Sequence, residues 1–141
     1  MRLYLDTSLL VAALTNEAET SHVQAWLGAQ IADDLAISDW VTTEFSSTLS
    51  VKLRSGQIEP PYRAEVLATF ARLSADSLAV LPISASQFRT AAHFADQHAL
   101  GLRAGDALHL AVCADHGAML CTLDRRLGAA GPALGVQTML L

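Results

Sequence analysis

The chain has 141 residues and a net charge of −5; 52% of its residues are hydrophobic and only 16% are charged. This length fits one domain, residues 1–141, that buries a substantial core. The negative charge argues against a protein that holds nucleic acid by bulk electrostatics alone, although bound Mg²⁺ would cancel part of the charge at a nuclease site. No apolar run is long enough to cross a membrane, because charged residues or glutamine interrupt each one.

The two cysteines indicate the redox compartment. Cys113 and Cys121 form no C-x-x-C pair and lie in apolar segments, so we expect buried, reduced thiols and a cytoplasmic protein. The N-terminus has Arg2 but no long apolar region followed by a small-residue cleavage pattern, so we expect no signal peptide.

Short apolar runs alternate with segments of helical periodicity along the chain. The runs predict strands at about residues 2–5, 35–38, 78–81, 119–122 and 136–140. The segments between them predict helices at about residues 8–14, 18–32, 39–54, 60–73, 84–98, 104–116 and 125–129. Strands that alternate with helices predict an α/β fold, with a central, mostly parallel sheet of about five strands flanked by α-helices on both faces.

Four carboxylates fall at the boundaries of these elements. Asp6 and Asp124 each end an apolar strand, Glu44 lies in the first turns of the helix after the second strand, and Asp106 opens the helix at 104–116. In a parallel sheet the strand ends and the helix starts lie on one edge, where ligands bind. Four acids gathered there would repel one another unless a cation lay among them. The pattern therefore predicts a divalent metal site, and with it an enzyme.

Each acid also has a purely structural interpretation. Asp6 and Asp124 could each cap the helix that follows. Glu44 could be an exposed acid favoured by the helix dipole, and Asp106 could pair with Arg103 three residues earlier. The structural interpretation is weaker for the four acids together, because every one of them falls at the predicted edge.

Four segments, in order, resemble the motifs of PIN domains. They are residues 5–11 (Leu-Asp-Thr-Ser-Leu-Leu-Val), residues 38–44 at a strand-to-helix turn, residues 102–111 (Leu-Arg-Ala-Gly-Asp-Ala-Leu-His-Leu-Ala) and residues 122–127 (Thr-Leu-Asp-Arg-Arg-Leu). The match spans almost the whole chain, so residues 1–141 are interpreted as a single PIN domain. Among PIN domains, compact chains with this ending are most similar to VapC-type toxins of type II toxin–antitoxin pairs.

The resemblance implies an endoribonuclease that depends on Mg²⁺ or Mn²⁺, a cognate antitoxin that inhibits it, an RNA substrate, no membrane association and commonly a homodimer. Asp6, Glu44 and Asp106 are the first predicted metal ligands or orienting groups and catalytic residues, and Asp124 is the second-rank member. Independently, Mg²⁺ takes oxygen ligands and keeps several waters, and phosphodiester hydrolysis needs an activated water and charge stabilisation. Hydroxyl groups near these acids could orient them by hydrogen bonding: Thr7, Ser8 and Thr122.

Two other functions remain open. One is a PIN-like module that has lost catalysis and binds protein or RNA, which four intact acids argue against. The other is a different metal-dependent phosphohydrolase; the haloacid dehalogenase type would need a second aspartate two residues after Asp6, where Ser8 stands.

Three further patterns have structural interpretations first. His109 is expected to pack beside the site rather than to act in catalysis. Eight of the nine basic residues are arginine, but they are spread along the sequence, so no basic patch is predicted. Val41, Phe45 and Leu49 recur at helical spacing and predict core burial, or alternatively, with the helix at 8–14, an apolar groove for an antitoxin segment.

Overall fold

The computed structural model describes residues 1–141 and contains one parallel sheet. Its strands are β1 (Leu3–Leu5), β2 (Leu35–Ser38), β3 (Ala79–Leu81), β4 (Met119–Thr122) and β5 (Thr138–Leu140). They lie in the order β3-β2-β1-β4-β5, and every neighbouring pair is parallel. The predicted α/β class and its parallel sheet are confirmed.

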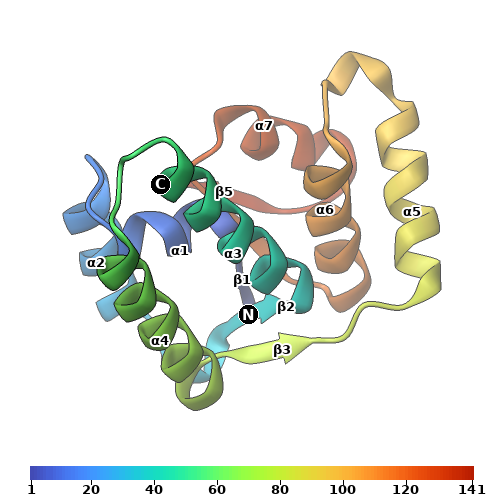
Figure 1. Cartoon of the computed structure of the whole chain (residues 1–141). Coiled ribbons are helices and arrows are strands. Elements are labelled where there is room, and N and C mark those ends of the chain that lie inside the picture. The colour runs from blue at the N-terminus through green and yellow to red at the C-terminus, as the bar shows by residue number, and fades with distance from the viewer.

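Seven α-helices flank the sheet (Figure 1). They are α1 (Thr7–Leu14), α2 (Thr20–Gly28), α3 (Asp39–Arg54), α4 (Pro60–Ser77), α5 (Ala85–Asp96), α6 (Ala104–His116) and α7 (Arg125–Ala133), with short 3₁₀ turns at Ala32–Asp34 and His98–Leu100. Helices α1 to α4 pack against one another on one side of the sheet, whereas α5, packed along α6, and α7 lie on the other side.

Some helix and strand boundaries differ from those predicted from the sequence. The helix predicted over 18–32 ends at Gly28, because a glycine inside a helix costs about 1 kcal/mol relative to alanine. Helix α4 instead continues to Ser77, since no glycine or proline interrupts it after its Pro-Pro start. The last strand begins at Thr138 rather than at residue 136, after Gly135, which has a positive φ of 77°.

The main core covers both faces of the sheet, and on one face it fills the space under α1 to α4. Val41, Phe45 and Leu49 of α3 are fully buried there, and the Phe45 ring stacks on Phe70 of α4 with 4.2 Å between ring centroids. Leu9 of α1 is also fully buried. An apolar groove lined by these faces of α1 and α3 is therefore a wrong prediction, because the same side chains already form the core.

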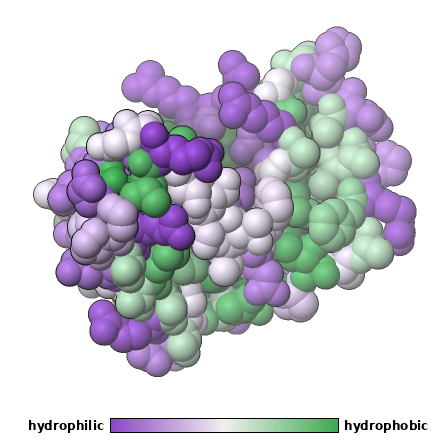
Figure 2. Space-filling view, viewed as in Figure 1, coloured by the Kyte–Doolittle hydropathy of each residue, from purple (hydrophilic) through white to green (hydrophobic).

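Surface hydrophobic residues are unevenly distributed. Figure 2 shows them gathered on the side formed by α5 and α6, whereas polar residues cover much of the rest of this face. Phe88 of α5 is one of the few large apolar side chains that are mostly exposed, at 58%. None of the helices combines the length and the apolar character that a membrane span requires.

The topology places one crevice at the centre of the sheet. Strand β1 pairs with both β2 and β4, and the chain leaves β1 into α1 on one side but leaves β4 into α7 on the other. Such a switch point opens a crevice at the carboxyl ends of the strands. The Asp6 amide donates to the Cys121 carbonyl at 3.2 Å, which extends the β1–β4 ladder to the first predicted acid.

Candidate functional site

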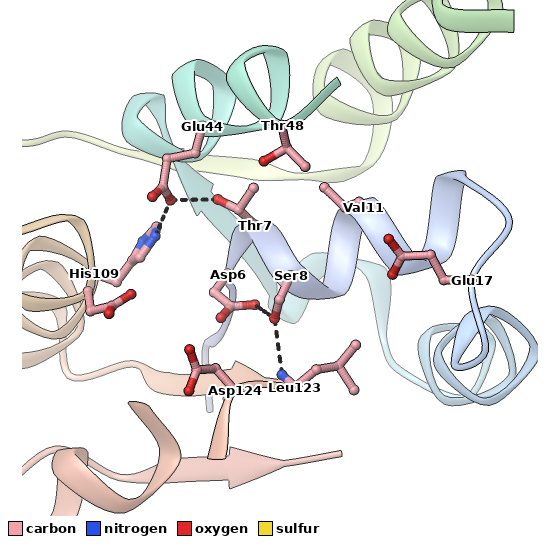
Figure 3. A pocket seen from close by; sticks show the side chains of 11 residues that line it. Asp6, Thr7, Ser8, Val11, Glu17, Glu44, Thr48, His109, Leu123 and Asp124 are labelled. Carbon is pink, nitrogen blue, oxygen red and sulfur yellow. Dashed lines mark hydrogen bonds and ion pairs between the residues drawn. The ribbon is translucent and has the colours of Figure 1, made fainter. Parts of the chain in front are cut away.

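The crevice holds a cleft of about 480 Å³, which we call the acid cleft (Figure 3). All four predicted acids line it, so the structure brings together residues from β1, α3, α6 and the end of β4 as the sequence predicted. Its complete lining is Asp6, Thr7, Ser8, Val11, Glu17, Glu44, Thr48, Asp106, His109, Leu123 and Asp124.

Asp6 is the most firmly held of the four. Its Oδ1 accepts hydrogen bonds from the Ser8 hydroxyl at 2.6 Å and from the Leu9 amide at 3.1 Å, and its Oδ2 accepts one from the Thr122 hydroxyl. The Leu9 bond makes Asp6 the N-cap of α1, so this carboxylate has both a structural role and a place in the cleft. The side chain is only 4% exposed, and burial raises its pKa although the hydrogen bonds oppose that shift.

Glu44 lies in the second turn of α3 and reaches across the cleft to α6 (Figure 3). Its Oε1 accepts the Thr7 hydroxyl at 2.7 Å and makes a very short contact with His109 Nε2. Burial alone would raise the pKa of Glu44, but the hydrogen bond and positive charge that His109 offers, together with Thr7, outweigh burial and lower it. The predicted orienting roles of Thr7, Ser8 and Thr122 are thus confirmed as hydrogen bonds.

A buried chain of hydrogen bonds lies behind His109. The Tyr4 hydroxyl lies 2.8 Å from His109 Nδ1 and 2.7 Å from the Ser38 hydroxyl. With His109 charged, Nε2 donates to Glu44, Nδ1 donates to the Tyr4 hydroxyl, and Tyr4 donates to Ser38. His109 is 2% exposed. From the sequence, His109 was predicted only to pack beside the site. In the structure its Nε2 atom also contacts the Glu44 carboxylate and so positions it.

Asp106 and Asp124 are held more loosely. Asp106 lies in the first turn of α6; burial raises its pKa first, and the nearby charge of Asp124 raises it further. It makes no ion pair with Arg103, so the alternative structural interpretation is wrong. Asp124 is exposed at the margin, and its Oδ1 caps α7 by accepting from the amides of Arg126 and Leu127 at 2.9 and 3.1 Å.

No lysine or arginine pairs with any of the four predicted acids of the cleft. The chain's ion pairs are Lys52 with Glu17, at one end of the cleft, and His109 with Glu44. No three His, Cys, Asp or Glu side chains are arranged closely enough to hold a metal ion directly. The donors are nevertheless hard oxygens on separate elements, and a hydrated Mg²⁺ needs only one or two direct carboxylates. The residues therefore fit a cation that is bound partly through water.

Comparison with known proteins decides the family. The PIN domain model matches residues 3–131. The chain belongs to the PIN domain family. No curated protein sequence matches it.

Several solved structures share the fold of this PIN domain. VapC20 of Mycobacterium tuberculosis, described as a sarcin-ricin loop cleaving toxin, is 20% identical, with a TM-score of 0.74 over 92% of this chain and 95% of that chain. FitAcB of Neisseria gonorrhoeae is 19% identical, with a TM-score of 0.70 over 97% and 96% of the two chains. VapBC2 of Rickettsia felis, bound to a fragment of its promoter DNA, is 17% identical, with a TM-score of 0.68 over 99% and 98%.

Proposed function

We propose that this PIN domain is a metal-dependent endoribonuclease and the toxin of a toxin–antitoxin pair. The observation that carries the proposal is the convergence of Asp6, Glu44, Asp106 and Asp124 in one cleft where none of these four acids pairs with a lysine or arginine. Four carboxylates kept together without such a counter-ion favour a bound cation. The RNA-cleaving description of the neighbour VapC20 supports RNA as the substrate.

Mg²⁺ or Mn²⁺ would be held by Asp6, Glu44 and Asp106, with Asp124 at a second position or acting through water. When bound, such an ion supplies a lowered water pKa and charge stabilisation at the phosphate. The chain's own residues set the geometry. Ser8, Leu9 and Thr122 fix both oxygens of Asp6, and Thr7 and His109 fix one oxygen of Glu44, so its Oε2 makes no hydrogen bond within the chain.

The partner part of the proposal is a cognate antitoxin, with the toxin itself as a homodimer in the cytoplasm. A neighbour of this fold, VapBC-5 of Mycobacterium tuberculosis, is described as a member of the VapBC family of toxin–antitoxin systems, and this supports an antitoxin partner. The two cysteines are buried and free, which suits a reducing compartment.

The cleavage test uses the purified chain and a pool of single-stranded and structured RNA. Cleavage should appear with Mg²⁺ or Mn²⁺, stop with a chelator and return when the ion is added back. The matched variants are Asp106→Asn, which should be inactive, and Asp96→Asn, an aspartate at the end of α5 outside the cleft, which should remain active. Equal cleavage by wild type and Asp106→Asn in saturating Mg²⁺ would refute the assignment.

The partner test is separate from the nuclease test. Co-expression with the neighbouring upstream gene should give a complex that co-purifies and suppresses toxicity. Light scattering after size exclusion should show a dimer at micromolar concentration. A strictly monomeric chain would overturn the dimer, and absence of both co-purification and suppression would overturn the toxin–antitoxin assignment while leaving the nuclease in place.

A further inference from the structure

A second cleft, of about 650 Å³, adjoins the acid cleft. The two share Glu44, Asp106 and Asp124 on their common wall. The opposite wall consists of the loop before α6, the start of α6 and the start of α7. We call this the arginine cleft; its lining is Trp40, Glu44, Gly101, Arg103, Ala104, Gly105, Asp106, Asp124, Arg125 and Arg126.

Three of the chain's nine basic residues line this cleft, namely Arg103, Arg125 and Arg126. The fold therefore creates the basic patch that the sequence spacing did not predict. All three side chains are exposed, and none lies within 4.0 Å of a carboxylate. Arg126 is held at the cleft by a 3.5 Å contact between its Nη1 and the Gly101 carbonyl. The guanidinium groups are thus free to bind a ligand although three acids line the same cleft.

Other donors accompany the arginines. Helix α6 has thirteen residues, and its N-cap, Arg103, makes no side-chain cap, so its first backbone amides lack that partner. A helix N-terminus and three guanidinium groups favour an anionic ligand with several acceptor oxygens.

We propose that the arginine cleft binds the phosphates of single-stranded RNA that flank the bond to be cut. This inference rests on the proposed nuclease function, because that function places the scissile phosphate in the adjoining acid cleft. Guanidinium groups match phosphate oxygens in planar, bidentate pairs. Where no cation covers them, the acids repel phosphates. An RNA strand that has its scissile phosphate in the acid cleft therefore continues along Arg103, Arg125 and Arg126 in the arginine cleft. Phosphate is favoured over an acidic protein segment because the two clefts are continuous.

The test measures the binding of a fluorescent, single-stranded oligouridine of about 12 nucleotides by anisotropy in Mg²⁺. All variants carry Asp6→Asn to prevent cleavage, since Asp6 lines only the acid cleft. Arg103→Ala, Arg125→Ala and Arg126→Ala should each weaken binding roughly five- to ten-fold. Each should also flatten the slope of log affinity against log salt by about 0.7. Lysine at the same positions should restore the slope but only part of the affinity.

The controls remove the same charge elsewhere. Arg72→Ala in α4 and Arg89→Ala in α5 replace exposed arginines outside both clefts and should leave affinity unchanged. Circular dichroism melts of every variant exclude unfolding as a cause. Equal binding by the cleft and control variants would overturn the inference. So would arginine-dependent binding of a polyglutamate peptide combined with arginine-independent binding of the RNA.

The two proposals fail in different ways. If the wild type cleaves RNA with Mg²⁺ but the cleft variants bind like the controls, only the arginine-cleft inference is overturned. If the cleft variants lose binding but the wild type cleaves no RNA with either ion, the nuclease function is overturned and the phosphate-binding cleft stands.

Discussion

Asp6 and Asp106 face the same cleft, yet the fold holds them differently. Asp6 is 4% exposed, caps α1 and accepts three hydrogen bonds from Ser8, Leu9 and Thr122. Asp106 is half-buried, and the nearby charge of Asp124 adds to the effect of its burial. Asp6 therefore combines a structural role with a place in the cleft, whereas Asp106 caps no helix and makes no ion pair with Arg103.

The largest expected effect is a difference in unfolding free energy between alanine variants of these two acids. Asp6→Ala and Asp106→Ala should both lower metal-dependent cleavage roughly 10²–10³-fold, because each removes charge from the site. Asp6→Ala should also cost about 2–4 kcal/mol of unfolding free energy, since it removes a helix cap and leaves the buried Thr122 hydroxyl and the half-buried Ser8 hydroxyl without their acceptor. Asp106→Ala should leave metal-free stability level or higher. Urea unfolding with a chelator present measures this, and equal losses in the two variants would break the comparison.

The next effect tests how strongly cleavage depends on the position of the Glu44 carboxylate. A Cβ atom added at Gly105 would lie 2.9 Å from Glu44 Oε2 and 3.0 Å from Trp40 Nε1. Gly105→Ala should therefore displace Glu44 and lower cleavage roughly 10- to 100-fold. Gly28→Ala is the matched control, because a Cβ there meets nothing within 4 Å, and cleavage should be unchanged. Wild-type turnover in Gly105→Ala would mean that the position of Glu44 is not critical.

A smaller effect is expected from the hydrogen-bond chain behind His109. Tyr4→Phe removes the hydroxyl between His109 and Ser38 without touching the cleft, and should lower kcat about 10-fold with little change in KM. Tyr62→Phe, at the only other tyrosine, should not change it. A change in KM alone would show that these hydrogen bonds affect RNA binding rather than the position of Glu44.

The smallest effect is the pH dependence of metal-free stability. The pKa values of Asp6 and Asp106 are raised in the fold, so the native state takes up protons first as pH falls and gains stability through that window. The pKa of Glu44 is lowered, so its contribution is present above its unfolded pKa and is lost as pH falls through the folded value. Asp106→Asn should melt slightly above wild type at neutral pH, and the difference should vanish in acid. A difference that grows in acid would contradict this sign.

Alternating apolar runs were enough to predict the parallel sheet, because buried strands such as β2 need apolar residues on both faces. The convergence of the four acids followed from the rule that strand ends share an edge. The contacts that position Glu44 could not be predicted in this way. His109 contacts Glu44 and is itself held by Tyr4, and the Tyr4–His109 contact joins residues 105 positions apart that only the packing of α6 against β1 brings together. The arginine cleft was missed for the same reason: only the fold brings the start of α6, with Arg103, and the start of α7, with Arg126, to one cleft.

The position of β1 has a consequence for synthesis. Strand β1 is made before its neighbour β4, and the Asp6 carboxylate accepts a hydrogen bond from Thr122, 116 residues later. A growing chain that carries Asp6 and Glu44 but lacks β4 therefore has neither the strand that seats Asp6 nor the residues around Asp124. The acid cleft is therefore assembled only after β4 and Asp124 have been made, and a nascent chain that stops before β4 carries no complete cleft.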